Sequence, residues 1–584
     1  MTRPAWPDPS ELRIGLGCMR LSTDERRDEE RAAETIAAAA EAGITVFDTA
    51  RAYGHGEAEL GHNEGLLARA LRACGHARTA RIVTKGGMTR PGGAWGGWVP
   101  DGRAKAIAAD CEASLLALDG LPIDLYLLHA PDPRTPWRTS VRALARLLDQ
   151  GVVARVGLSN VGRHQLDEAL ELAPVTAVEV ALSPYDERAV RGGVLERCAE
   201  LGIAVIAHSP LGGPRRAGGL ARRRPWADVA DALGVDAAEV ALAWLLDLAP
   251  NVIAIPGARR PGTARSAAHA AQLRLAADEL AVLGGAPEPH PRPRRPRPRA
   301  GTEVVLVMGI PGAGKSRLAA DYTARGYLRL NRDERGGGLR ELARALDESL
   351  SSGLRRVVLD NTYLSRASRS YAIEAASRHE IPARCLWLNT PLAQAQLNLI
   401  HRLIERFGTL PAPDELRRLA RSEPGVLMPT SQMRALRELE PPSADEGFAS
   451  VEVIPFARVP PPEPEARGVF VAAAALRGAV WERTVQSGDP GAPHLVFDWT
   501  PGGALETLDP CVRHLRAAVS GPVRSALCPH GGGPPTCWCR PPLPGLVLDF
   551  AQAHELAPAG SILIGTSSAH RTLATTLGAR YLAV

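Results

Sequence analysis

The stretch Glu303–Tyr322, EVVLVMGIPGAGKSRLAADY, contains an apolar run, a glycine-rich turn and a helical segment in that order. The run from Val304 to Met308 predicts a buried strand. The residues that follow fit the spacing G-x-x-x-x-G-K-S, in which backbone N–H groups at the start of a helix cradle phosphate groups. A strand that leads through such a turn into a helix is typical of an α/β domain with a parallel sheet.

This turn predicts a nucleotide site that uses ATP with Mg²⁺. Lys315 would bridge the β- and γ-phosphates, and the Ser316 hydroxyl would ligate Mg²⁺. The residues expected to hold the nucleotide are Gly309, Gly312, Ala313, Gly314, Lys315, Ser316 and Arg317. The motif does not identify the group that accepts the phosphate.

Three later stretches suggest the acceptor. NRDE places Asp333 after an apolar run, LDN places Asp360 at the next strand end, and HRLIER places Arg402 and Arg406 on one helix face. This set resembles the polynucleotide 5′-hydroxyl kinases. The resemblance implies that Asp333 is the general base on the 5′-hydroxyl and that Arg406, with Arg402, contacts the donor phosphates.

Other interpretations of these residues stay open. Asp333 could instead cap a helix, and the two arginines could lie on a solvated helix face. The family also holds the acceptor phosphate with an arginine shortly after the aspartate, and Arg335 stands one residue away from that spacing. Related folds phosphorylate sugars, antibiotics and other small alcohols, so a small-molecule acceptor is the alternative to nucleic acid.

Two proline-rich runs divide the 584 residues. PEPHPRPRRPRPRA ends at residue 300 and VPPPEPEARG begins at residue 459. Proline cannot donate ladder hydrogen bonds, so both predict extended linkers, although the basic first run could also touch phosphates. We expect domains at residues 1–286, 301–458 and 468–584, with linkers at 287–300 and 459–467.

The first of these domains alternates short apolar runs with helical stretches rich in alanine. The runs are ITVFD, RIVTK, DLYLLH, VVARVGLSN, AVEVALS, IAVIAHS and NVIAIPG. This alternation predicts a (β/α)₈ barrel, in which the chemistry lies at the C-terminal ends of the strands. Asp48, Lys85 and His129 stand at such ends.

The motifs FDTARAYGHGEAELG, VTKGG, LYLLHAPDP, GLSN, HSPLG and IPGARRPGTARSAA resemble the aldo-keto reductase family. The resemblance implies a tetrad of Asp48, Tyr53, Lys85 and His129. Tyr53 would protonate the carbonyl oxygen as hydride arrives, and Lys85, paired with Asp48, would lower the pKa of Tyr53. His129 would orient a small carbonyl substrate. A buried salt bridge beside a core tyrosine is the non-catalytic alternative.

The same resemblance implies an NADPH site. Ser159 and Asn160 would hold the carboxamide, and Arg259 and Arg265 would bind the adenosine phosphate. Glu179 stands where the family usually has Gln, and His208 stands where it usually has an aromatic ring. The remaining residues assigned to the cofactor are Ser209, Pro210, Leu211 and Gly257.

The third domain contains CPHGGGPPTCWC, residues 528–539. This loop, together with RPPLPG and SILIGTSSAHRTLATTLGA, resembles haloacid-dehalogenase-type phosphatases of the heptose-bisphosphate and histidinol-phosphate branch. The resemblance implies a Rossmann-like fold and a structural Zn²⁺ on Cys528, His530, Cys537 and Cys539. The family's two catalytic aspartates are replaced by Ala472 and Ala474, so we expect a phosphatase domain without activity, retained for folding or binding.

Composition sets outer limits on function. Nine cysteines, of which three stand in one loop, argue against a disulfide framework. The first residues have no apolar signal-like region and no apolar run spans a bilayer, so we expect a cytoplasmic protein without membrane contact. We count only three lysines, so the net charge of +5 is carried by arginine and is weak evidence for a nucleic-acid partner. Two of the three, Lys85 and Lys315, stand in the motifs above. The sequence leaves the oligomeric state open.

The segments together suggest two functions. In the first, an end-repair enzyme phosphorylates the 5′-hydroxyl ends of nucleic acid and reduces aldehydes left at damaged sugars. In the second, a metabolic enzyme reduces a carbonyl and phosphorylates a sugar or other small alcohol.

Overall fold

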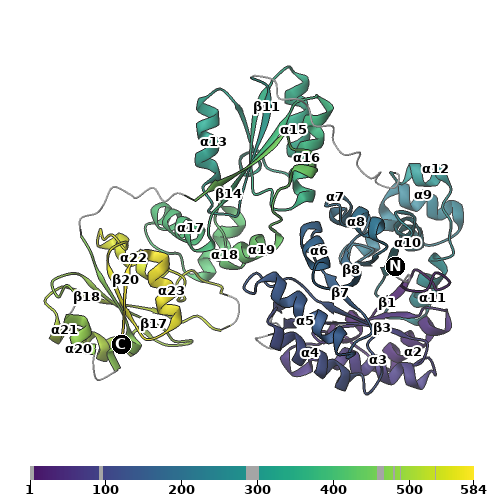
Figure 1. The fold of residues 1–584 in the computed structure, drawn as a ribbon, viewed down its shortest axis with the longest axis horizontal. Coiled ribbons are helices and arrows are strands. Elements are labelled where there is room, and N and C mark those ends of the chain that lie inside the picture. The colour runs from purple at the N-terminus through teal and green to yellow at the C-terminus, as the bar shows by residue number, and fades with distance from the viewer. Residues whose placement is uncertain are drawn as a thin grey trace. The chain divides into compact units, whose positions relative to one another are not determined.

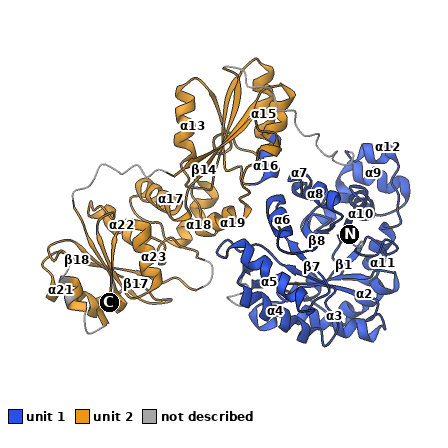
Figure 2. Ribbon diagram, in the orientation of Figure 1, with its two compact units in different colours: residues 1–293, 365–371 blue, residues 294–364, 372–584 orange. Residues whose placement is uncertain are grey.

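The computed structural model describes residues 6–90, 97–284, 301–456, 466–477, 481–486, 488–532 and 535–584. The linker predicted at 287–300 and most of the one at 459–467 lie outside these residues. The chain divides into two compact units, residues 1–293 with 365–371 and residues 294–364 with 372–584 (Figure 2).

The first unit contains a closed parallel barrel (Figure 1). Parallel bridges between Ile14 and Ala254 and between Gly17 and Gly257 join its first strand to its last. The order around the sheet is β1 (Gly15–Gly17), β2 (Val46–Asp48), β3 (Arg81–Gly86), β6 (Leu125–Leu128), β7 (Val156–Ser159), β8 (Val175–Ala181), β9 (Ala204–His208) and β10 (Val252–Ile255). The barrel prediction is confirmed, although β1 was not among the predicted runs.

Helices surround this barrel, and β4 (Met88–Thr89) pairs antiparallel with β5 (Val99–Pro100). The described helices are α1 (Met19–Thr23), α2 (Glu29–Glu41), α3 (His62–Ala73), α4 (Ala104–Ala117), α5 (Trp137–Asp149), α6 (Arg163–Leu170), α7 (Arg188–Arg191), α8 (Val194–Leu201), α9 (Arg224–Leu233), α10 (Ala237–Asp247), α11 (Pro261–Ala270) and α12 (Ala277–Val282).

The alternation of side chains along each strand separates two cores. Val46 packs inside the barrel with Val83 and Leu125, whereas Phe47 packs outward with the helices. Because both faces of each strand are buried, the strands read as continuous apolar runs, as expected for parallel sheets covered by helices. The polar residues are left at the strand ends, where Asp48, Ser159 and His208 each end a strand.

The second unit contains two further parallel sheets. The first has the order β12 (Leu328–Asn331), β13 (Arg356–Asp360), β11 (Glu303–Met308), β14 (Ala383–Asn389) and β15 (Ser450–Pro455). The second has the order β18 (Val523–Cys528), β17 (His494–Trp499), β16 (Val469–Ala472), β19 (Ile562–Gly565) and β20 (Arg580–Ala583). In each sheet the strand that comes first in the sequence is central, as in doubly wound α/β folds.

The helices of this unit follow the same alternation. They are α13 (Lys315–Ala324), α14 (Arg332–Arg335), α15 (Leu339–Ser351), α16 (Arg366–Arg378, of which residues 366–371 group with the first unit), α17 (Leu392–Phe407), α18 (Pro413–Ser422), α19 (Pro429–Glu438), α20 (Trp481–Gln486), α21 (Asp509–Ala518), α22 (Gly545–Ala553) and α23 (Ser568–Leu577). Within the part of the chain that is described, no helix is both long enough and apolar enough to cross a membrane.

One apolar cluster joins the two sheets of this unit. Leu399, Ile400 and Leu403 of α17 pack with Phe550 of α22 and Leu573 of α23. Figure 1 shows these three helices next to each other. The two predicted domains of the unit therefore share part of their core, which we call the shared core.

Candidate functional site

The barrel places five ionisable or aromatic side chains together at the C-terminal ends of its strands. Asp48 ends β2, Lys85 lies in β3, Glu179 lies in β8, and His129 directly follows β6. Tyr53 reaches the same place from the loop after β2. Each of the five is at most 5% exposed, so their charges interact with little screening by water.

Lys85 is at the centre of this cluster. Its Nζ donates to Asp48 Oδ2, lies 3.2 Å from Glu179 Oε2 and 3.3 Å from the Tyr53 hydroxyl oxygen. It also donates to the backbone carbonyl of Thr49 at 3.1 Å. The structure thus brings together the predicted tetrad members Asp48, Tyr53 and Lys85, and adds Glu179 as a second carboxyl group.

Burial and charge act in opposite directions on these groups. Burial opposes the charge on Lys85, but the carboxylates of Asp48 and Glu179 outweigh it and raise the pKa of Lys85 well above its usual value. Burial and then the charge of Asp48 raise the pKa of Glu179 to about 8. One ammonium and two carboxyl groups are electrically balanced when Glu179 carries a proton.

The pKa of Tyr53 differs from the expectation. Burial raises it, and the opposing charge of Lys85 is too small to reverse that shift. The expected net lowering is therefore wrong, because the hydroxyl is almost completely removed from water. A phenol with a raised pKa keeps its proton at neutral pH and so remains available as a proton donor.

His129 and Trp98 complete the surroundings of Tyr53. The ring of Tyr53 lies 5.8 Å from that of His129 and 5.8 Å from that of Trp98. Burial and then the charge of Lys85 lower the pKa of His129 well below its usual value, so the imidazole is neutral. Among the described residues, its buried Nδ1 has no hydrogen-bond partner. Buried polar atoms are usually satisfied, so this atom is available to a ligand or to water.

The predicted carboxamide residues lie beside this cluster. Asn160 Nδ2 donates to the His129 carbonyl at 3.1 Å and to Ser159 Oγ at 3.0 Å, and His208 Nε2 lies 3.2 Å from Asn160 Oδ1. Asn160 and Ser209 have φ angles of +58° and +51°. Backbone in this left-handed region is uncommon outside glycine and is concentrated at functional sites.

The arginines predicted to bind the adenosine phosphate lie near α11. Arg259 Nη1 is 2.9 Å from Asp24 Oδ2, and its side chain is half exposed. Arg265 is exposed on α11. Gly257 forms the bridge to Gly17 that closes the barrel. Pro210 and Leu211 follow β9, next to Ser209.

In the second unit the glycine-rich turn after β11 has the backbone that the motif requires. Gly309, Gly312 and Gly314 have φ angles of +154°, +85° and +96°. A Cβ added to Gly312 would lie 2.3 Å from the carbonyl oxygen of Ala395, so only glycine fits there.

Side chains from the following helices hold this turn in place. Asn398 Nδ2 donates to the Gly312 carbonyl at 2.8 Å, and Gln432 Nε2 donates to the Pro311 carbonyl at 3.1 Å. Lys315 Nζ donates to the carbonyls of Gly309 and Ile310, both at 3.0 Å. Burial lowers the pKa of Lys315 to about 8, and Asp360 opposes this shift only in part.

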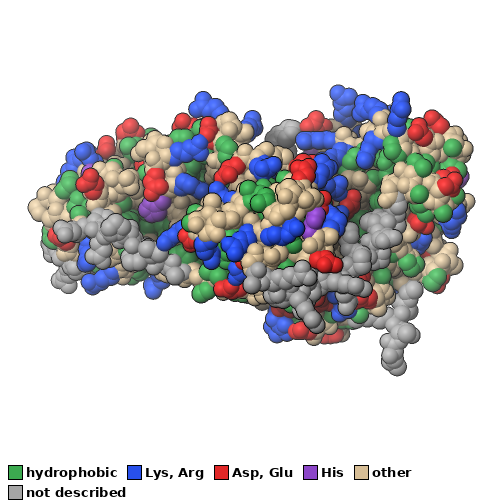
Figure 3. Space-filling view, turned by 90° about the horizontal axis from the view of Figure 1, so that it is seen from above, with side chains coloured by type: hydrophobic (Ala, Val, Ile, Leu, Met, Phe, Trp, Pro, Cys, Tyr) green, Lys and Arg blue, Asp and Glu red, His purple; other side chains and the backbone are tan. Residues whose placement is uncertain are grey.

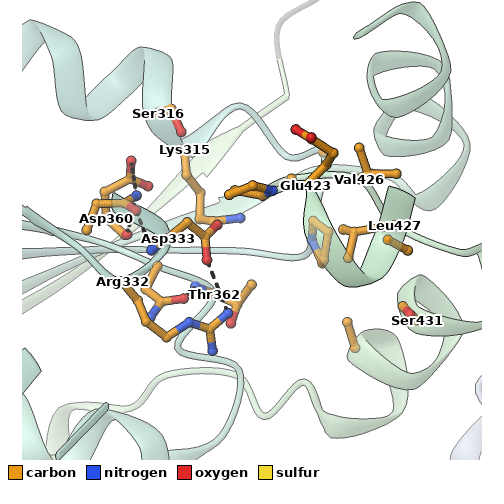
Figure 4. A pocket seen from close by; sticks show the side chains of 18 of the residues that line it. Lys315, Ser316, Arg332, Asp333, Asp360, Thr362, Glu423, Val426, Leu427 and Ser431 are labelled. Carbon is orange, nitrogen blue, oxygen red and sulfur yellow. Dashed lines mark hydrogen bonds and ion pairs between the residues drawn. The ribbon is translucent and has the colours of Figure 1, made fainter. Parts of the chain in front are cut away.

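A cavity of about 610 Å³ opens in front of Lys315. Its floor is the glycine-rich turn with the ends of β12 and β13, and its wall is the end of α18, the loop 423–428 and α19. Figure 4 shows Lys315 and Asp333 on one side of the cavity and Glu423, Val426 and Leu427 on the other. We call residues 423–428 the wall loop.

Asp333 lies at this cavity with its carboxylate exposed. The alternative in which Asp333 caps a helix is wrong, because the Asn331 side chain caps α14 by accepting from the N–H groups of Asp333 and Glu334. Asp360 is buried and accepts from Arg329 and Asn331, at 2.6 and 3.1 Å. Of the two carboxylates, Asp333 and Asp360, Asp333 is therefore the one that a substrate can reach.

The two arginines of α17 lie in different surroundings. Arg402 lines the cavity, whereas Arg406 donates to the Pro424 carbonyl at 3.2 Å and pairs with Glu423. Arg406 thus holds the wall loop. Three lining residues, Arg332, Asn361 and Arg434, were not assigned a role from the sequence. Among the described residues, Asn361 Nδ2 is buried without a hydrogen-bond partner, so it is a donor that a ligand could use.

The C-terminal part of the second unit brings together Cys528, His530, Cys537 and Cys539, which we call the Cys/His cluster. One ligand atom of each lies within 4.8 Å of the others. Two of these separations are 3.2 Å, between His530 Nδ1 and Cys539 Sγ, and 3.7 Å, between the sulfurs of Cys528 and Cys537. These four predicted ligands therefore converge.

The segments that follow β16 and β19 in the same sheet carry few side chains that could take part in a reaction. β16 ends at Ala472, followed by Ala473 and Ala474, and β19 ends at Gly565, followed by Thr566 and Ser567. In doubly wound sheets ligands bind beside the first strand, at these ends. Neither segment carries a carboxylate.

Comparisons with known proteins identify the first unit. The barrel, with its buried cluster at the strand ends, belongs to the class of barrel enzymes that carry out their chemistry there. The model of the aldo/keto reductase family matches residues 13–285. An uncharacterized oxidoreductase of Schizosaccharomyces pombe is 31% identical over 276 residues, which cover 46% of this chain and 85% of the relative. The chain belongs to the aldo/keto reductase family, and this part of it is an oxidoreductase.

Other comparisons cover parts of the chain. A thermostable aldo-keto reductase solved with the inhibitor epalrestat is 30% identical, with a TM-score of 0.41, covering 46% of this chain and 93% of that one. An aldo-keto reductase from Klebsiella pneumoniae, solved with NADPH, is 27% identical, with a TM-score of 0.40, covering 46% and 89%. The model of an AAA domain matches residues 304–409, which contain the glycine-rich turn.

Proposed function

We propose that the chain combines an NADPH-dependent carbonyl reductase with an ATP-dependent kinase that phosphorylates the 5′-hydroxyl ends of nucleic acid. The observation that carries the kinase half is the convergence of Lys315, Asp333 and Arg402 on one cavity beside a glycine-rich turn. The reductase half rests on family membership and on the buried cluster around Lys85.

In the reductase, NADPH would supply the hydride. Tyr53 holds the proton that the carbonyl oxygen needs, and Lys85, 3.3 Å away, stabilises the phenolate that remains. The neutral imidazole of His129 can donate a hydrogen bond to the same oxygen. The half-exposed Arg259 and the exposed Arg265 are suited to an adenosine phosphate.

In the kinase, the residues of the cavity have separate roles. Asp333 accepts the proton of the acceptor hydroxyl as the hydroxyl oxygen bonds to the γ-phosphorus. At the same time, the bond between the γ-phosphorus and the oxygen that bridges it to the β-phosphate breaks. Lys315 and Arg402 stabilise the charge on the phosphates. The glycine-rich turn would supply N–H groups to the phosphates, and the Ser316 hydroxyl would ligate Mg²⁺.

Phosphate transfer from γ-labelled ATP to 5′-hydroxyl oligonucleotides, RNA and DNA in parallel, tests this function. We expect Asp333→Asn to reduce transfer by about 10²–10⁴-fold, the usual contribution of a general base. Glu334→Gln is the matched control, because Glu334 is an exposed carboxylate one residue along that pairs with Arg329 and does not line the cavity. Equal activity of wild type and Asp333→Asn would contradict the assignment.

The alternative acceptor is a sugar or another small alcohol. Basic and acidic side chains are interspersed on the face seen in Figure 3, whereas nucleic-acid binding usually relies on a basic stripe. Transfer to small alcohols but to neither oligonucleotide, abolished by Asp333→Asn, would establish this alternative.

For the C-terminal part we infer an inactive haloacid-dehalogenase-type domain that binds Zn²⁺. Ala472 and Ala474 cannot attack phosphorus or protonate a leaving group. The Cys/His cluster fits Zn²⁺, since tetrahedral ligands at about 2.3 Å have sulfurs about 3.8 Å apart, and Cys528 Sγ lies 3.7 Å from Cys537 Sγ and 3.4 Å from Cys539 Sγ. We expect one zinc per chain by atomic absorption and no hydrolysis of p-nitrophenyl phosphate.

A further inference from the structure

The wall loop of the kinase cavity is held at both ends by side chains from outside it. At its start, Arg406 of α17 donates to the Pro424 carbonyl at 3.2 Å and pairs with Glu423. Near its end, Trp538 donates from its indole Nε1 to the Leu427 carbonyl at 3.0 Å. Leu427 and Glu423 both line the cavity, so both contacts fix the surface that faces Lys315 (Figure 4).

Trp538 comes from the C-terminal part of the unit and is held tightly there. It is 1% exposed and packs in the shared core with Val426 and Leu416. A Cβ added to Gly545 would lie 2.4 Å from the backbone oxygen of Trp538, so helix α22 presses directly against its backbone. A movement of the tryptophan backbone would therefore displace Leu427 or open the shared core.

The sequence around Trp538 connects it to the Cys/His cluster. Its two neighbours in the chain are Cys537 and Cys539, and each sulfur belongs to the cluster. An ion bound by both sulfurs fixes the backbone between them and thus the direction of the indole. Without an ion, only weak thiol contacts join these buried sulfurs, at 3.7 Å between Cys528 and Cys537 and 3.4 Å between Cys528 and Cys539.

We propose that Trp538 is a positioning residue of the kinase cavity, and that a metal ion in the Cys/His cluster controls nucleotide binding through it. This rests on the proposed kinase function, because it assumes that the cavity binds a nucleotide. The C-terminal part then keeps its metal loop for the reaction of its neighbour. The metal acts through the wall loop and takes no part in phosphate transfer.

The experiment uses the full chain and compares Trp538→Phe with Trp499→Phe. Each variant loses one indole hydrogen bond of the C-terminal part, because Trp499 Nε1 donates to the His530 carbonyl at 2.8 Å. We expect Trp538→Phe to raise the KM for ATP about fivefold, the factor equivalent to one neutral hydrogen bond, with kcat within twofold. Trp499→Phe should leave both unchanged.

Three readouts separate positioning from loss of structure. A merely structural role would lower the active fraction, and hence kcat, without moving KM. The NADPH-linked reductase of the first unit reports whether the chain is folded. Zinc content by atomic absorption shows that both variants still hold the metal.

Removal of the metal gives the decisive comparison. After treatment with a zinc-selective chelator in excess Mg²⁺, the wild type should show the same rise in KM, and added Zn²⁺ should reverse it. Chelation should not raise the KM for ATP of Trp538→Phe any further, because chelation and the substitution both interrupt the same connection from the metal through Trp538 to the wall loop. Additive effects, or an unchanged KM in a chelated wild type that still binds ATP, would overturn the inference. Failure of the untreated wild type to bind ATP would instead overturn the proposed kinase and this inference with it.

Discussion

The two lysines at the proposed sites, Lys85 fully buried and Lys315 partly buried, differ in the groups that surround their charges. Lys85 lies between Asp48 and Glu179, whose charges raise its pKa well above the usual value. Among the described residues, Lys315 donates to two backbone carbonyls and to no side chain, and burial lowers its pKa to about 8. The barrel thus carries its counterions within the fold, whereas the glycine-rich turn leaves room for the charge of a phosphate. Under the proposed function, the same residue type is a structural and catalytic group in one site and a substrate contact in the other.

Replacing each of the two lysines by methionine is the strongest test of this difference. Lys85→Met leaves two buried carboxyl groups without a cation, so we expect loss of reductase activity and a stability lower by about 3–5 kcal/mol. Lys315→Met should abolish phosphate transfer but change stability by less than about 1 kcal/mol, because no buried carboxyl group loses its cation in this variant. Urea-dependent proteolysis of the full chain measures the stability of each unit separately. Equal destabilisation by both variants would contradict the comparison.

The pH dependence of barrel stability tests the second carboxyl group. Glu179 has its pKa raised from 4.5 to about 8, so the folded barrel holds a proton that the unfolded chain releases between these values. The contribution of Glu179 to stability should therefore fall as pH rises through that window, by about 2 kcal/mol from pH 6 to 7.5. Glu179→Gln should remove this slope, measured by urea unfolding at each pH. The exposed Glu112→Gln is the control, and it should keep the slope.

The smallest effect concerns nucleotide affinity. Because Lys315 has a pKa of about 8, it loses its charge above that pH, and the affinity for ATP should fall. We expect a rise in Kd of at most about tenfold from pH 8 to 9, measured by isothermal titration calorimetry. Lys315→Arg should make whatever affinity remains independent of pH, since arginine stays charged. Lys105→Arg, on the outer surface of α4, should behave as the wild type.

Local patterns predicted much of the fold. Seven of the barrel strands are apolar runs, and the glycine-rich turn is contiguous, so the strand, turn and helix could be identified within a short window. Strand β1 was missed because Gly15–Gly17 has only one apolar side chain and is held by pairing with β2 and closure against β10. Strand pairing of this kind is decided by distant residues.

The sequence predicted the residues of the barrel cluster but only some of those at the kinase cavity. The members of the barrel cluster stand at strand ends, which a parallel barrel brings together. The separate positions of Arg402 and Arg406 depend on where the wall loop lies, which no helix periodicity indicates. Arg434 and the contact of Trp538 with Leu427 had no signal in the sequence either, because they join segments that are far apart in the chain.

The shared core has a consequence for the evolutionary history of this chain. If the C-terminal part descends from the phosphatases proposed above, replacing its catalytic aspartate by alanine at the end of β16 would leave the packing of Phe550 and Leu573 on α17 intact. A deletion of residues 468–584 would expose Leu399, Ile400 and Leu403 to water. On that proposal, selection could tolerate the loss of catalytic residues in this segment but not the loss of the segment itself. Such a domain would persist in descendants as a fixed part of its neighbour long after its own reaction had disappeared.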